Sequence, residues 1–392
     1  MTSQRKNSTI LINQEAFGTL LLIQNQILGK FNKLMNEDEA DEVIRSGYFQ
    51  NEPMPYAYTF APFGKKNQKT ILEAKQGDKI ELIKDGKIVG HIVCSSVFKL
   101  NNAEASIFRA RDISLPSNQR AGEFAISGEF EIYQDSLKER KAYTKRIIEN
   151  YNIKKITALM LTADPFHRLH ERLVRMTIDK ADLLIIFLIR TFDGDKRLSF
   201  DLRLKTLEFF KDNFLPHDRV IIVPFENTYL FNDHINPVLE CIAAHNFGAT
   251  KLVVGQNHGG IGMFYDESGA NTALDKYSKD LNLEVIVMPE FVYCNECRTI
   301  VSTKTCPHGQ HHHIKYHANT LKELLYQGIL PPAILMRKEI SAMILSELFP
   351  NRFYDLQRIY DDLFPNSGIL EKHNQKEFYE QLMNLYQTTS LT

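Results

Sequence analysis

Hydrophobic and polar residues alternate in several short stretches of the first third of the chain. Alternation of this kind, with β-branched residues among the apolar positions, is typical of strands with one buried face. The stretches cover residues 57–60, 79–84, 87–94 and 123–133. Asp85-Gly86 separates the second stretch from the third and is a strong signal for a hairpin turn. Because residues 1–45 and 134–151 have partly helical patterns, we predict a mostly β domain with a helical connector over residues 1–150.

From Ile156 onward the pattern changes to strand, helix, strand, helix. Apolar runs of strand length and helical patterns follow one another at 156–161, 183–189, 199–214, 220–223, 237–247, 251–254 and 283–288. Strands separated by single helices predict a parallel, doubly wound sheet, which we place in an α/β domain of residues 151–290. Ligands of such sheets bind beyond the carboxyl ends of the strands. The loops after Leu161, Ile189, Val223 and Val254 should therefore meet in one cleft.

The remaining residues, 291–392, are predicted to form a third region. It begins with a segment rich in cysteine and histidine, and its pattern is largely helical from residue 321 to residue 387. Pro331-Pro332 and Pro350 interrupt the helical pattern, because proline cannot continue a helix as an interior residue. The predicted fold class is therefore α/β, with a β-rich region before the parallel sheet and a helical region after it.

Charge and composition narrow the classes of partner. The chain has 392 residues and a formal net charge of -1. A balanced charge gives no general attraction for nucleic acid or for an anionic membrane, so any anion site must be local. No apolar run approaches the length that spans a bilayer, and the first residues lack the pattern of a signal peptide. We expect a cytoplasmic protein without nucleic-acid or membrane partners.

Two histidines stand where the first predicted strand gives way to a helix. The break after Leu161 contains Asp164 as the expected N-cap and Pro165 as the expected first helical residue. His167 and His170 then fall on one side of the first helical turn, beside free backbone N–H groups and the positive end of the helix dipole. Such imidazoles can bind phosphate and stabilise charge on a leaving pyrophosphate. Surface histidines without a role, or a metal site, are the alternatives.

A glycine-rich loop follows the predicted strand at 251–254. It contains Gly255, Gln256, Asn257 and His258, and further glycines follow up to residue 262. Glycines let backbone N–H groups approach a nucleotide closely. A plain turn is the alternative, but the position at the carboxyl end of a strand favours nucleotide binding.

Three of the five cysteines lie close together in the third region. Cys294, Cys297 and Cys306 have the spacing of a metal site, and the fourth ligand is left open between His308 and His311, with His312 also within reach. Three thiolates and one imidazole make a tetrahedral set that fits Zn²⁺, and four protein ligands indicate a structural ion. Cys94 and Cys241 lie in apolar segments and are interpreted as buried small side chains.

Four motifs, in matching order, resemble the bacterial ATP sulfurylases, also called sulfate adenylyltransferases. They are LTADPFHRLHERL, LVVGQNHGGIGMFYD, FVYCNECRTIVSTKTCPH and QGILPPAILMRKEI. The resemblance covers nearly the whole chain. It implies a PUA-like domain at the N-terminus, where GDKIELIKDGKIVG and GEFAISGEFEIY look like that family, and a nucleotidyltransferase core with paired histidines.

The resemblance also implies a reaction, in which a sulfate oxygen attacks the α-phosphorus of ATP and pyrophosphate leaves. Carried over, His167 and His170 would bind the ATP phosphates and the leaving pyrophosphate, and Thr162 and Asp164 would line the phosphate end. Leu161 and residues 255–258 would lie along the nucleotide. The partners implied are ATP with Mg²⁺ and a small oxyanion. Zinc would be structural, and a homo-oligomer is implied because family members are commonly oligomeric.

The sequence departs from the family pattern where sulfate is expected to bind. The family's Gln-Thr-Arg-Asn-Pro appears as residues 161–165, LTADP, so the amide and guanidinium that hold sulfate are replaced by Leu161 and Ala163. The loop Gly-Arg-Asp-His appears at 255–258 without its arginine. Cations that could compensate are Arg168, Arg190, Lys196, Arg197 and Arg203. Two alternatives follow: nucleotidyl transfer to a different acceptor, or a non-catalytic relative that binds nucleotide or a partner.

Overall fold

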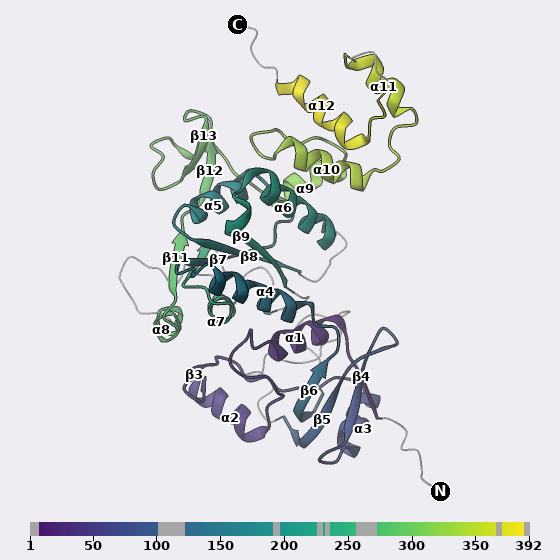
Figure 1. Ribbon diagram of the computed structural model, residues 1–392, viewed down its shortest axis with the longest axis vertical. Helices are drawn as coiled ribbons and strands as arrows, with labels where there is room; N and C mark the ends of the chain where they lie inside the picture. Colours follow the sequence, from purple (N-terminus) through teal and green to yellow (C-terminus); the bar gives the residue numbers. More distant parts are fainter. Residues whose placement is uncertain are drawn as a thin grey trace. The chain divides into compact units, whose positions relative to one another are not determined.

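The computed structural model describes residues 8–100, 122–190, 197–225, 230–231, 236–255, 273–365 and 371–387 (Figure 1). The chain divides into two compact units. The first unit contains residues 1–162, 181–192 and 221–288, and the second contains residues 163–180, 193–220 and 289–392. The domain boundaries predicted at residues 150 and 290 remain predictions. None of the described helices combines the length and the hydrophobicity that crossing a bilayer requires.

The β-rich part of the first unit is a four-stranded sheet in the order β1-β4-β5-β6. Its strands are β1 (Thr9–Leu11), β4 (Lys79–Lys84), β5 (Lys87–Lys99) and β6 (Phe124–Ile132). The hairpin predicted at Asp85-Gly86 is confirmed: both residues have positive φ, 50° and 75°, as a tight turn between twisted strands requires. In the stretch at 57–60, Ala57 and Phe60 form only isolated bridges, that of Phe60 to Ile126, so the prediction of a strand is wrong.

Short helices and a small hairpin accompany this sheet. They are α1 (Gln14–Gln24), α2 (Glu37–Ser46), β2 (Tyr48–Phe49), β3 (Glu52–Pro53), α3 (Lys65–Glu73) and α4 (Ser136–Asn150). Asn36 and Glu39 cap the start of α2 reciprocally, which satisfies two backbone N–H groups that the helix itself leaves unpaired. The connector predicted over residues 134–151 is confirmed as α4.

The predicted parallel sheet is present in the first unit. Its strands are β7 (Ile156–Leu161), β8 (Leu183–Ile189), β9 (Val220–Phe225), β10 (Lys251–Gly255) and β11 (Glu284–Met288), in the order β11-β10-β7-β8-β9. Every residue of β7 and β8 is buried, which explains why all their residues except Thr157 are apolar. The helices between the later strands are α7 (Pro237–Asn246) and α8 (Ala273–Asp280).

The strand order places two candidate loops beside each other. The direction of the strand order reverses between β7 and β10, which pair in parallel with Val253 opposite Leu159. Leu161 and Gly255 therefore end neighbouring strands at the switch point of the sheet. In open α/β sheets the ligand binds beyond the strands at this point. The ligand cleft expected beyond these two residues stays a prediction.

The second unit consists of helices and a small three-stranded sheet. The helices are α5 (Arg168–Ile178), α6 (Phe200–Phe214), α9 (Ala318–Tyr326), α10 (Lys338–Leu348), α11 (Leu356–Leu363) and α12 (Gln375–Gln387). The sheet, in the order β13-β12-β14, contains β12 (Phe291–Cys294), β13 (Thr299–Ser302) and β14 (His313–Ile314). The largely helical pattern predicted from residue 321 is confirmed.

The start of α5 differs from the prediction. Its N-cap is His167 and its first residue is Arg168, so Asp164 is not the N-cap and Pro165 is not the first helical residue. Ala163 has a left-handed backbone conformation, φ 50°, and the Asp164 carboxylate accepts a hydrogen bond from Lys322 in α9. The chain therefore makes a longer turn before the helix begins, and this turn brings His167 to the helix end.

Candidate functional site

The two histidines form a stacked pair at the start of α5. Their ring centroids lie 3.9 Å apart, and the backbone N–H of His167 donates to Nδ1 of His170 over 3.2 Å. Because a backbone N–H can only donate, Nδ1 of His170 is the acceptor. The neutral ring of His170 therefore carries its proton on Nε2, where it can donate to a ligand.

The environment of His167 keeps its ring neutral. The residue is only 4% exposed, and burial together with the neighbouring His170 lowers its pKa well below the ordinary value of 6.5. The ring of Tyr316 stacks on it at 5.4 Å. Its Nδ1 is buried and has no hydrogen-bond partner among the described residues. A buried nitrogen without a partner is costly, and a bound ligand could supply the missing hydrogen bond.

Asp164 belongs to a buried ion pair. One carboxylate oxygen accepts from Nζ of Lys322 in α9 over 2.7 Å, and the other accepts from the backbone N–H of Leu198 over 3.0 Å. Asp164 and Lys322 are each 8% exposed. Buried charges are stable only when they are paired and hydrogen-bonded, and both conditions are met here. The pair joins the turn before α5 to α9 and uses the positive charge of Lys322 internally.

Glu171 gathers two arginines on the first turn of α5. Its carboxylate accepts from Arg337 twice, over 3.1 and 2.7 Å, and from Arg168 over 3.1 Å. The guanidinium of Arg337 also lies over the ring of Phe214, 3.7 Å from its centroid. A bidentate contact of this kind fixes the orientation of both side chains more firmly than a single hydrogen bond does. The ion pairs of Glu171 with Arg168 and Arg337 therefore stabilise the helical turn that carries the histidine pair.

We expect Glu171→Gln to reduce the free energy of unfolding by about 2–3 kcal/mol, because two guanidinium groups would lose their carboxylate partner. The loss stays below that of a fully buried pair since the side chains of Arg168 and Arg337 are 29% and 15% exposed. Denaturant unfolding would measure it. As the control, Glu347→Gln should change stability by less than about 1 kcal/mol, because its pair with Lys205 is more than half exposed. Equal effects of the two variants would contradict the expectation.

Three cysteines and one histidine converge in the predicted metal segment. The ligand atoms of Cys294, Cys297, Cys306 and His308 all lie within 4.8 Å of one another. Nδ1 of His308 is 3.5, 3.3 and 3.6 Å from the three sulfur atoms in that order. A tetrahedral zinc site, with Zn–S and Zn–N bonds of about 2.3 and 2.1 Å, has ligand-to-ligand edges of about 3.5–3.8 Å. The four residues therefore fit a metal ion, and His311 is not among them.

The other predicted residues lie in different places. Leu161 and Gly255 end strands of the first unit, Thr162 directly follows β7, and Gln256, Asn257 and His258 lie outside the described residues. Of the cations expected to compensate for lost arginines, Arg168 contacts Glu171, and Lys196 is not described.

The sequence reasoning missed Lys322, Glu171, Arg337 and Tyr316. One signal was available for Lys322, which lies beside the buried Leu321 and one turn before the buried Leu325. A lysine in such an apolar helical pattern indicates a buried charge with a partner. Nothing in the sequence identifies Asp164 as that partner, because the two residues are far apart in the chain.

The comparisons with known proteins decide the family. The family model described as ATP-sulfurylase matches residues 135–347, which is more than half of the chain. The chain belongs to the ATP-sulfurylase family. This membership confirms the resemblance that the four motifs indicate. The matched residues include the histidine pair, the parallel sheet and the Cys/His segment.

Relatives within the ATP-sulfurylase family share about a quarter of their residues with this chain. A sulfate adenylyltransferase of Carboxydothermus hydrogenoformans is 26% identical over 274 residues, covering 66% of this chain and 71% of the relative. One of Psychrobacter cryohalolentis is 26% identical over 365 residues, covering 88% and 86%. Among solved structures, a hexameric APS kinase from Thiobacillus denitrificans has a TM-score of 0.65 at 14% identity. The match covers 89% of this chain and 64% of that longer chain, and it shows a shared fold.

Proposed function

We propose that this protein transfers the adenylyl group of ATP to sulfate, giving adenosine 5′-phosphosulfate and pyrophosphate. Membership of the ATP-sulfurylase family supports a nucleotidyltransferase. The observation that carries the proposal is the histidine pair: two stacked imidazoles at a helix start, in which the buried Nδ1 of His167 has no hydrogen-bond partner among the described residues. Such groups suit the oxygens of a leaving pyrophosphate.

In the proposed reaction an acceptor oxygen forms a bond to the α-phosphorus while the bond to the β-phosphate oxygen breaks. The electron pair of that bond leaves with pyrophosphate. His167 and His170 would bind the phosphates and stabilise this charge. Thr162 would line the phosphate end with Asp164. Leu161 and residues 255–258 would lie along the nucleotide.

Two ions accompany the proposal. Mg²⁺ would arrive with the ATP phosphates and reduce their charge. Asp164 and Glu171 would not bind this Mg²⁺, because both carboxylates already accept hydrogen bonds from cationic side chains. We further propose that the metal of the Cys/His site is structural zinc, held by Cys294, Cys297, Cys306 and His308, since a set of four protein ligands leaves no open position for catalysis.

The remaining parts of the proposal rest on the family. Residues 1–150 would form the PUA-like domain with its connector. The protein would work in the cytoplasm and assemble as a homo-oligomer, as the hexameric solved structure suggests for this fold.

One observation favours a second candidate, adenylyl or other nucleotidyl transfer to a different acceptor. Ala163 offers no charge where the family pattern has an arginine, and Lys322 is neutralised by Asp164 at 2.7 Å. An oxyanion that approached Lys322 would have to displace or face the carboxylate of Asp164. Since like charges repel strongly where water is excluded, a less negative acceptor would bind more readily.

Pyrophosphate release from ATP tests both candidates. Release with sulfate or molybdate, at rates typical of enzymes, would support sulfate transfer. Release only with acceptors of lower charge would support the second candidate, and no release with any acceptor would refute the proposed activity. In the same assay Asp164→Asn frees Lys322 from its carboxylate. If the ion pair excludes sulfate, this variant should use sulfate better than the natural chain does.

A further inference from the structure

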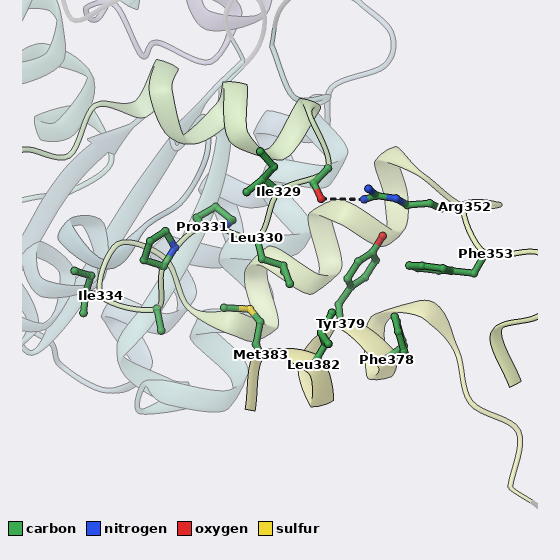
Figure 2. Close-up of a pocket in the computed structure, with 13 residues that line it drawn as sticks. Ile329, Leu330, Pro331, Ile334, Arg352, Phe353, Phe378, Tyr379, Leu382 and Met383 are labelled. Carbon is green, nitrogen blue, oxygen red and sulfur yellow. Dashed lines mark hydrogen bonds between the residues drawn. The ribbon is translucent and has the colours of Figure 1, made fainter. Parts of the chain in front are cut away.

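A large cavity lies among the C-terminal helices of the second unit. It has a volume of about 910 Å³ and plays no part in the proposed transfer. The loop of residues 328–334 forms one wall, and residues of α12 form another (Figure 2). Pockets for small molecules typically measure about 300–1,000 Å³ and are mostly apolar. The cavity has the size and the lining of a ligand site.

The lining changes in character from one end of the cavity to the other. Leu330 and Met383 belong to an aliphatic part, whereas Phe353 and Phe378 lie toward Arg352 (Figure 2). Arg352 is the one charged side chain among the described residues that line the cavity. Its guanidinium donates to the backbone oxygen of Gly328 over 2.9 Å, and the residue is otherwise exposed. Arg352 therefore has N–H groups left for an anionic ligand.

A second donor lies at the same end. Tyr379 is only 2% exposed, and its hydroxyl has no hydrogen-bond partner among the described residues. Figure 2 shows this hydroxyl directed toward the side where Arg352 lies. A buried hydroxyl without a partner is unfavourable, so the polar end of the cavity lacks a hydrogen-bond acceptor. One carboxylate could accept from both groups.

We propose that this cavity binds an apolar carboxylate, such as a fatty acid. The carboxylate would lie against Arg352 near Tyr379, and the hydrocarbon chain would extend along the aliphatic lining. The charge of the ligand is complementary to the single positive charge of the cavity, and its apolar body is complementary to the rest. The proposal does not depend on the acceptor of the transfer reaction.

The loop that forms one wall is hydrogen-bonded to Arg168 and Tyr316, two neighbours of the histidine pair. Nε of Arg168 donates to the backbone oxygen of Ala333 over 3.1 Å, and the hydroxyl of Tyr316 donates to that of Ile334 over 2.7 Å. Tyr316 in turn stacks on His167. A ligand that shifts this loop would therefore change the surroundings of His167. The cavity is placed to regulate the histidine pair.

Calorimetric titration with decanoate and with its methyl ester tests the binding. The natural chain should bind decanoate more tightly, because only decanoate carries a charge. Arg352→Ala should weaken the binding of decanoate by about tenfold or more and leave the binding of the ester unchanged, given the usual strength of a charge-assisted hydrogen bond. Arg358→Ala is the matched control, since this arginine of α11 is 65% exposed and does not line the cavity. It should change neither titration.

Two further measurements locate the ligand and test the coupling. Ile329 is 47% exposed, so Ile329→Glu should fold normally while placing a carboxylate at the cavity that repels decanoate. Decanoate should also shift the imidazole resonances of His167 and His170. Equal affinity of the natural chain for acid and ester, or undiminished decanoate binding by Arg352→Ala and Ile329→Glu, would overturn the proposed site. Unshifted imidazole resonances at saturation would overturn the coupling.

Discussion

Replacing His170 by alanine should lower pyrophosphate release from ATP by about 10²- to 10³-fold, the usual effect of removing one donor from a developing oxyanion. The same is expected for His167→Ala. The reason is geometric: Nδ1 of His170 is occupied by the backbone N–H of His167, so Nε2 carries the proton that a phosphate oxygen would accept. The measurement is turnover at saturating ATP with the acceptor that proves active.

Conservative replacements make this test sharper. His170→Gln places an amide N–H near the position of Nε2 and should recover part of the activity, whereas His170→Asn reaches only the position of Nδ1 and should not. His217 is exposed and serves as the control, so His217→Ala should be fully active. Because His167 is buried, thermal unfolding of each variant must separate lost chemistry from lost folding. Full activity of a folded His170→Ala would refute the proposed role of the pair.

Removing the metal should loosen the segment of residues 294–314. We expect about one zinc ion per chain in metal analysis, because the set of three thiolates and one imidazole is closed. His308→Ala should lose most of this zinc, since Nδ1 of His308 lies within 3.6 Å of all three sulfur atoms. Metal binding of this kind contributes directly to folding. Hydrogen exchange should therefore become faster through β12, β13 and β14.

The neighbouring histidines supply the control for the metal prediction. His311→Ala should keep its zinc and its protection from exchange, because His311 is not among the four converging ligands. His312 contacts Glu296 over 3.3 Å instead. If His308→Ala retained a full complement of zinc, or if His311→Ala lost it, the ligand assignment would be wrong. A chelator added to the natural chain should reproduce the effect of His308→Ala on exchange.

Local sequence patterns determined the elements of this fold. The apolar runs predicted the strands of the parallel sheet almost to the residue, because a strand buried on both faces consists mostly of apolar side chains. Asp85-Gly86 determined a hairpin, since its turn needs two residues that tolerate positive φ. The cysteine spacing predicted a metal site, because ligands near in sequence can reach one ion without help from the rest of the fold. In each case the physical constraint acts over a few neighbouring residues.

Tertiary structure alone decided which groups meet. The sequence left His308 and His311 open as the fourth ligand, and only the folded chain shows that His308 lies at the sulfur atoms. Asp164 was predicted as a helix cap, but Lys322 of α9 takes its carboxylate, and α5 therefore begins at Arg168. Such pairings depend on contacts between residues far apart in the chain, which no local pattern encodes. The sequence by itself determined the family and the histidine pair. The pairing of Asp164 with Lys322 beside that pair was decided by tertiary packing, because the partner of a buried charge is the group that the fold brings next to it.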